Sequence, residues 1–69
     1  MADVVKLKQA IDRSGLKKGF IIEKLGITRQ GFRKKETGVY DFKSNEIAIM
    51  KDLLKLSDRD VIEIFLHTE

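Results

Sequence analysis

The chain has 69 residues with a formal net charge of +3; 42% of its residues are hydrophobic, 36% are charged, and none is cysteine. This length allows one small core, so we expect a single domain over residues 1–69, and the lack of cysteine excludes disulfide bonds and thiolate metal sites. No apolar run is long enough to cross a bilayer, and residues 1–4 do not resemble the start of a signal peptide, so we expect a cytoplasmic protein with no membrane partner.

The first two predicted helices are short and end at glycines. Val4, Leu7 and Ile11 recur at spacings of three and four residues, which predicts an amphipathic helix over residues 3–14, and a glycine at position 15 ends it. A second helix is expected over residues 17–24, with Gly26 in the left-handed conformation just after it.

A third helix is expected from Arg29 to about Thr37. Thr28 is a suitable N-cap, because its hydroxyl can accept a hydrogen bond from a free backbone N–H of the first turn. Gly38 closes the segment. Residues 39–42 are too few for an independent strand and predict a loop that packs Tyr40 or Phe42 against the core.

Two further helices are expected in the second half of the chain. Ser44 is a candidate cap for a fourth helix, which carries the apolar residues Ile47, Met50 and Leu54. The segment 57–60, Ser-Asp-Arg-Asp, is close to a capping box and predicts a fifth helix. The expected fold is therefore all-α, a compact bundle of about five short helices that contains a helix-turn-helix.

Charge is distributed unevenly along the chain. Residues 1–38 carry ten basic and four acidic side chains, whereas residues 39–69 carry four basic and seven acidic ones. A basic half of this kind favours a polyanionic partner, although a solvated Lys-rich surface has the same composition.

The predicted third helix separates polar from apolar side chains. At about 100° per residue, Arg29, Gln30, Arg33 and Lys34 fall on one face and Phe32 points away from them. Arg can make two hydrogen bonds to a guanine edge and Gln can do the same with adenine, while Lys contacts phosphate or guanine. Because this face follows a glycine turn with helix-turn-helix spacing, the pattern favours a helix that enters the major groove of double-stranded DNA.

The stretch from Lys17 to Gly38 resembles the helix-turn-helix of the Cro and phage-repressor family, in particular the small regulators of phages of Gram-positive bacteria. The resemblance rests on the turn Gly26-Ile27-Thr28 and the exit Glu36-Thr37-Gly38, and it extends through the closing segments 41–58 and 64–65. It implies a lambda-repressor-like fold and a sequence-specific regulator of transcription that acts in a bacterial host cell.

The resemblance also implies roles for individual residues. Arg29, Gln30, Arg33 and Lys34 become candidates for base contact. The candidates for phosphate contact are Lys17, Lys18, Thr28, Lys43 and Ser44.

Two positions differ from the family pattern. Ile22 replaces the usual alanine where the two motif helices cross, and Gly31 on the facing helix is expected to make room for it. Lys35 replaces an apolar anchor, so its stem is expected to pack while its ammonium group reaches solvent. These differences weaken the expectation of strong, autonomous DNA binding.

No enzyme is expected, and neither a metal nor a cofactor. The one histidine, His67, has no cysteine to join it in a zinc site. Asp58, Asp60 and Glu63 are acidic residues at the start of a helix, where the helix dipole favours them without any catalytic role.

A second function stays open on the sequence. The last predicted helix carries more apolar residues than one inward face needs, and Ile62, Phe65 and Leu66 are candidates for a protein interface. The interface would serve a homodimer, which suits a palindromic operator, or a partner repressor that this protein inhibits by direct contact.

Overall fold

The computed structural model describes residues 2–66. This range contains five α-helices: α1 Val4–Ser14, α2 Lys18–Leu25, α3 Arg29–Glu36, α4 Ser44–Leu54 and α5 Asp58–Phe65. It contains no strand, so the predicted all-α bundle is confirmed. None of the helices described is long and apolar enough to cross a bilayer.

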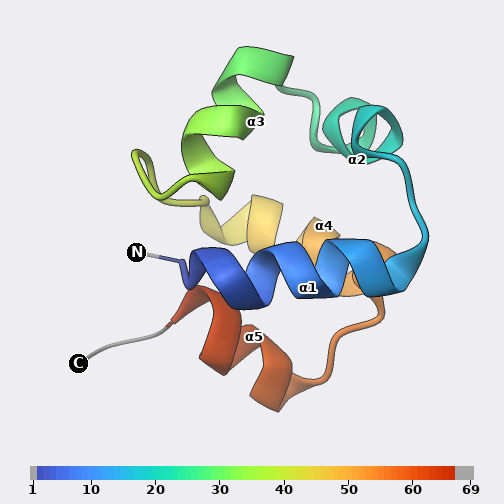
Figure 1. Ribbon diagram of the computed structural model, residues 1–69, viewed down its shortest axis with the longest axis vertical. Coiled ribbons are helices and arrows are strands. Elements are labelled where there is room, and N and C mark those ends of the chain that lie inside the picture. Colours follow the sequence, from blue (N-terminus) through green and yellow to red (C-terminus); the bar gives the residue numbers. More distant parts are fainter. Residues whose placement is uncertain (1, 67–69) are drawn as a thin grey trace.

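Helix α1 runs through the middle of the molecule and contacts α3, α4 and α5, as Figure 1 shows. Helix α2 packs on α4 and α3, and α5 closes the opposite end of the bundle. The backbone N–H of Asp3 donates to the carbonyl of Ile64 at 2.7 Å, which joins the start of α1 to the end of α5. The exposed side of α3 therefore lies far from α5 along the longest axis of the molecule (Figure 1).

The core is built around three phenylalanines from distant parts of the chain. The ring of Phe42 packs edge-on against Phe32 at 6.2 Å and against Phe65 at 5.3 Å between ring centroids. Of the two loop residues expected to pack inward, Phe42 does so, while Tyr40 is 54% exposed. The other fully enclosed side chains come from α1, α2 and α4: Leu7, Ile21 and Met50.

Side-chain caps define most of the helix starts. Asp3 accepts from the backbone N–H of Lys6, Thr28 accepts from Gly31 at 3.0 Å, and Ser57 forms a reciprocal capping box with Asp60. The prediction that Ser44 caps the fourth helix is wrong, because Ser44 is already its first helical residue and Lys43 occupies the N-cap position. Glu46 supplies the missing cap, as its carboxylate accepts from the backbone N–H of Lys43 at 2.8 Å.

The turn between α2 and α3 has three residues, Gly26–Thr28. Gly26 adopts a φ of 70°, a left-handed conformation that costs glycine little, and its N–H donates to carbonyls of the last turn of α2. Thr28 then starts α3 at once. The turn thereby holds two eight-residue helices next to each other with α3 at the surface.

Candidate nucleic-acid interface

Helix α3 presents polar side chains to solvent and anchors itself with one aromatic ring. Arg29, Gln30 and Arg33 are exposed, whereas Phe32 is only 1% exposed. This is the separation of faces that the helical periodicity predicts. No acidic residue lies in the first turn of α3, so the exposed side of its N-terminal half is entirely neutral or basic.

Arg29 leans toward α2 rather than extending straight into solvent. Its Nη2 atom lies 3.4 Å from the position that a Cβ atom on Gly19 would occupy. The two helices enclose an open groove whose lining residues are Lys18, Ile22, Arg29, Phe32, Arg33, Glu36 and Thr37. Its lining includes the apolar side chains of Ile22 and Phe32, three cations from Lys18, Arg29 and Arg33, and one acidic residue, Glu36.

The start of α2 differs from the other helix starts in the described range. Lys17, at the N-cap position, offers no side-chain acceptor, and the first turn contains no acidic residue. Helices α1, α3, α4 and α5 each have an Asp, Thr, Glu or Ser side chain that accepts from a first-turn or N-cap N–H. The N-terminal N–H groups of α2 thus face solvent with Lys17 and Lys18 beside them, an arrangement that favours an anion.

Two of the predicted contact residues already have partners within the protein. The ammonium of Lys18 lies 3.2 Å from the carboxylate of Glu36 at the end of α3. Lys34 is half-buried, and its ammonium lies 5.3 Å from the centre of the Tyr40 ring, a cation–π contact. Lys34 therefore sits at the margin of the exposed face of α3, next to the loop before α4.

Lys43, Ser44 and Thr28, the other predicted phosphate contacts, are all exposed. Thr28 has its hydroxyl engaged in the cap of α3, and the backbone N–H of Lys43 donates to Glu46. Lys43 is the N-cap residue of α4, and this end of α4 adjoins α3 (Figure 1).

The predicted outward placement of the Lys35 ammonium is wrong. Its Nζ lies 2.5 and 2.6 Å from the two carboxylate oxygens of Glu46, and the Lys35 side chain is only 11% exposed. Glu46 itself is 3% exposed, the only buried charged residue in the range 2–66. A buried carboxylate draws the ammonium inward because an unpaired charge there would be costly.

Gly31 does not make room for Ile22. A Cβ atom on Gly31 would lie 3.1 Å from the Thr28 hydroxyl, and no atom of Ile22 comes within 4 Å of it. The lack of a side chain at Gly31 leaves space for the N-cap of α3 instead, because the Thr28 hydroxyl accepts a hydrogen bond from the Gly31 N–H.

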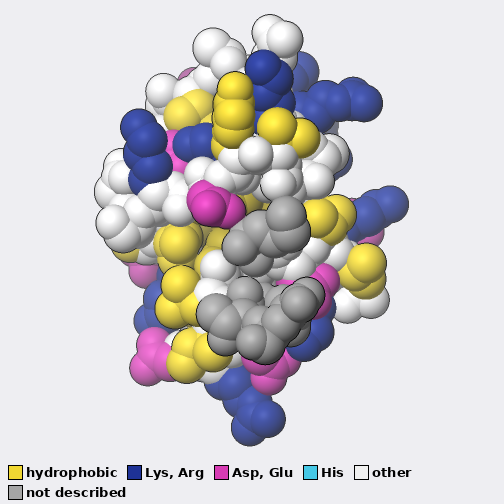
Figure 2. Space-filling model, turned by 90° about the vertical axis from the view of Figure 1, so that its left-hand side faces the viewer, with side chains coloured by type: hydrophobic (Ala, Val, Ile, Leu, Met, Phe, Trp, Pro, Cys, Tyr) yellow, Lys and Arg dark blue, Asp and Glu magenta, His cyan; other side chains and the backbone are white. Residues whose placement is uncertain are grey.

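The candidate protein interface on α5 is smaller than the sequence indicates. Phe65 is buried against Phe42 in the core and is not available to a partner. Ile62 and Leu66 are 56% and 55% exposed. Figure 2 shows one face of the molecule, on which several apolar side chains are exposed, with Lys and Arg at the margins.

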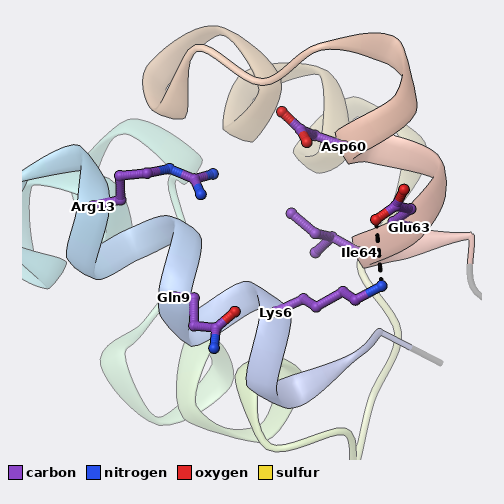
Figure 3. A pocket seen from close by; sticks show the side chains of 6 residues that line it. All are labelled: Lys6, Gln9, Arg13, Asp60, Glu63 and Ile64. Atoms are coloured by element: carbon purple, nitrogen blue, oxygen red, sulfur yellow. Dashed lines mark hydrogen bonds and ion pairs between the residues drawn. The ribbon is translucent and has the colours of Figure 1, made fainter.

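A second polar cluster joins α1 to α5 (Figure 3). A small pocket is lined by Lys6, Gln9 and Arg13 of α1 and by Asp60, Glu63 and Ile64 of α5, and the Lys6 ammonium lies 3.3 Å from the Glu63 carboxylate. Both acidic side chains already accept hydrogen bonds, Asp60 from Ser57 and Glu63 from Arg59. The cluster therefore serves to hold α1 against α5. Within residues 2–66, no group of three or more His, Cys, Asp or Glu side chains could hold a metal ion. His67 lies outside the described residues.

Glu36 and Glu46 are the important site residues that the sequence reasoning missed. The signal for Glu46 was present, because a glutamate three residues after an N-cap position commonly accepts from the N-cap N–H. Because Ser44 was predicted to be the N-cap, the capping role of Glu46 was not recognised.

Acid should weaken the fold through Glu46. Burial acts to raise the pKa of Glu46, but hydrogen bonds from Lys35 and from the Lys43 backbone outweigh it and hold the pKa below its ordinary value of 4.5. A lowered folded-state pKa stabilises the protein above pH 4.5, and this contribution is lost as the pH falls through the folded-state pKa. Asp60, held by Ser57, and Glu63, held by Arg59 and Lys6, also have lowered pKa values and act in the same direction.

Urea denaturation at a series of pH values from neutral to acid measures this effect. The free energy of unfolding should fall below pH 4.5, and the Glu46→Gln variant should show a shallower fall than the wild type. Equal slopes for the two proteins would contradict the role given to Glu46.

Comparison of the chain and its structure with protein-family models, curated proteins and solved structures finds no match.

Proposed function

We propose that this protein is a sequence-specific DNA-binding regulator of transcription, with α3 as the helix that enters the major groove. The observation that carries the proposal is the exposed row Arg29, Gln30 and Arg33 on a helix anchored by Phe32. The resemblance to small phage regulators adds the expected setting, control of phage or mobile-element genes in the cytoplasm of a bacterial host.

The dimensions and chemistry of α3 suit this role. An α-helix with its side chains is about 10–12 Å in diameter, and the major groove is about 12 Å wide. Arg29 and Arg33 each carry a planar guanidinium that can make two hydrogen bonds to guanine, and Gln30 lies between them for adenine. Lys34 is less exposed, and its place over Tyr40 suits contact with the edge of the groove or with phosphate.

The start of α2 supplies a phosphate-binding element next to α3. Its N–H groups have no side-chain acceptor, Lys17 and Lys18 stand beside them, and the Arg29 guanidinium lies against Gly19 in the first turn. Three cations near a positive helix end repel one another, and a phosphate placed there would relieve this repulsion. Lys18 is already paired with Glu36, which weakens its attraction for that phosphate. Lys17 should therefore contribute more to phosphate binding than Lys18.

The test is selection of preferred duplexes from a randomised pool, followed by binding measurements over a range of salt concentrations. Arg29→Ala should weaken binding to the selected duplex by about 1–3 kcal/mol and relax its sequence preference. Lys17→Ala should weaken binding to all duplexes alike and lower the slope of log K against log salt by about 0.9.

Arg59→Ala is the matched control, because Arg59 is a highly exposed cation on α5, at the opposite end of the molecule from α3 (Figure 1). It should leave both sequence preference and salt slope unchanged. If the wild-type protein enriches no sequence from the pool at any salt concentration, with or without a partner protein, the proposal fails.

Exposure of Ile62 and Leu66 favours a second candidate function, binding to another protein. In that case the protein acts as an antirepressor that binds a partner repressor and removes it from DNA. Co-purification with the repressor encoded next to it, and loss of that repressor's operator binding, would support this function. A wild-type protein that stays separate from the repressor, while Ile62→Ser and Leu66→Ser leave DNA binding intact, would exclude it. Sedimentation of the protein alone tests the homodimer.

A further inference from the structure

The buried pair Lys35–Glu46 connects the groove-facing helix to the start of the next helix. Lys35 is the seventh residue of α3 and Glu46 the third of α4, and the ammonium contacts both carboxylate oxygens. The same carboxylate accepts from the backbone N–H of Lys43 at 2.8 Å. One carboxylate therefore holds α3 on one side and the N-cap of α4 on the other.

From this geometry we infer that Lys35 and Glu46 are positioning residues that set how α3 is presented relative to Lys43, and thereby set sequence discrimination. The inference deepens the proposed function and depends on it. Lys43 is a candidate phosphate contact, while Arg29, Gln30 and Arg33 are candidate base contacts. The Glu46 carboxylate links α3 to Lys43, because it accepts hydrogen bonds from the Lys35 ammonium and from the Lys43 backbone N–H.

The buried apolar contact of α3 does not fix the direction of the helix. Phe32 is the only buried side chain of α3, and it meets Phe42 edge-on. Apolar contacts tolerate rotation and sliding of a short helix, whereas an ammonium held between two carboxylate oxygens fixes both distance and orientation. Replacing the pair with neutral side chains should therefore retain a folded α3 with a less defined position.

The other hydrogen-bonded ion pair of α3 cannot take over this task. Lys18 and Glu36 join α3 to α2, but the Lys18 side chain is 48% exposed, so solvent weakens the interaction. It also connects α3 to α2 and not to α4, within the groove between α2 and α3. Only Lys35 connects α3 to the α4 cap among the interactions of the described residues.

Three variants test the inference: Glu46→Gln, the double variant Lys35→Met/Glu46→Gln, and Lys6→Met/Glu63→Gln as a control pair between α1 and α5. The double variant leaves no unpaired buried charge, so it should be more stable than either single change, and glutamine can still accept from the Lys43 N–H. The ratio of dissociation constants for random and selected duplexes should fall roughly tenfold in the double variant, about the value of one bidentate base contact. The control pair should keep the wild-type ratio.

Hydrogen exchange of the backbone amides provides a readout that needs no DNA. In the double variant, protection should fall selectively at Phe32, Arg33 and the other amides of α3, while α1 amides keep their wild-type rates relative to global unfolding. Uniform loss of protection across all helices, or a wild-type duplex ratio in a folded double variant, would overturn the inference. If the wild-type protein shows no duplex preference, the proposed function is wrong, whatever the variants do. Selective loss of amide protection in α3 of the double variant then still shows whether the Lys35–Glu46 pair fixes the position of that helix.

Discussion

Replacing Lys35 with methionine should lower the free energy of unfolding by about 3–5 kcal/mol, which is the usual result of removing one partner of a buried ion pair. The change leaves Glu46 buried at 3% exposure with no countercharge. Small domains are stable by about 5–15 kcal/mol in total, so this loss would remove a large fraction of the free energy of unfolding. Urea denaturation followed by circular dichroism gives the value.

The companion variants make this result specific to the buried charge. Adding Glu46→Gln to Lys35→Met should recover much of the loss, because the buried group is then neutral and still hydrogen-bonded to Lys43. Lys6→Met is the matched control: it removes a lysine whose side chain is 45% exposed from its pair with Glu63 and should cost at most about 1 kcal/mol. A loss for Lys35→Met as small as that of Lys6→Met would show that the pair contributes little.

Replacing Phe32 with alanine should cost about 3–5 kcal/mol, because it leaves a cavity at the centre of the bundle. Phe32 is the only buried side chain of α3 and packs against Phe42, which in turn packs against Phe65. Its loss should therefore detach α3 and reduce DNA binding along with stability.

Phe20→Ala is the matched control for Phe32→Ala. Phe20 is 42% exposed and lies beneath the ammonium of Lys24, outside the core. Its removal should change the unfolding free energy by no more than about 1 kcal/mol. Equal losses for the two variants would mean that α3 is not anchored by Phe32.

The helices and most of their starts could be predicted from local sequence, because their signals act within one turn. Asp3, Thr28 and the Ser57–Asp60 box each place an acceptor three residues from the N–H it binds. The exposed row on α3 is also a local property, since the position of Phe32 determines which face turns inward. By contrast, α4 ends at Leu54, and the C-cap residue Lys55 adopts a left-handed conformation with a φ of 52°. No glycine in the sequence marks this helix end.

The candidate site could be predicted only in part, since solvent exposure and charge pairing depend on segments far apart in the chain. Arg29, Gln30 and Arg33 are exposed as expected, but Lys18 meets Glu36 across 18 residues and Lys34 meets the Tyr40 ring. The sequence predicted that Phe65 is an apolar residue beyond those the core needs, but its ring packs against Phe42 in the core.

By itself, the sequence determined the all-α class, the order of the helices and the polar face of α3, because periodicity and capping are short-range. Only the tertiary structure decided what Lys35, Glu46, Gly31 and Phe65 do. The reason is physical: the cost of a buried charge and the space around a side chain depend on which segments meet. Glu46 becomes buried only when α3, α4 and the loop between them pack together, and that burial turns Lys35 inward.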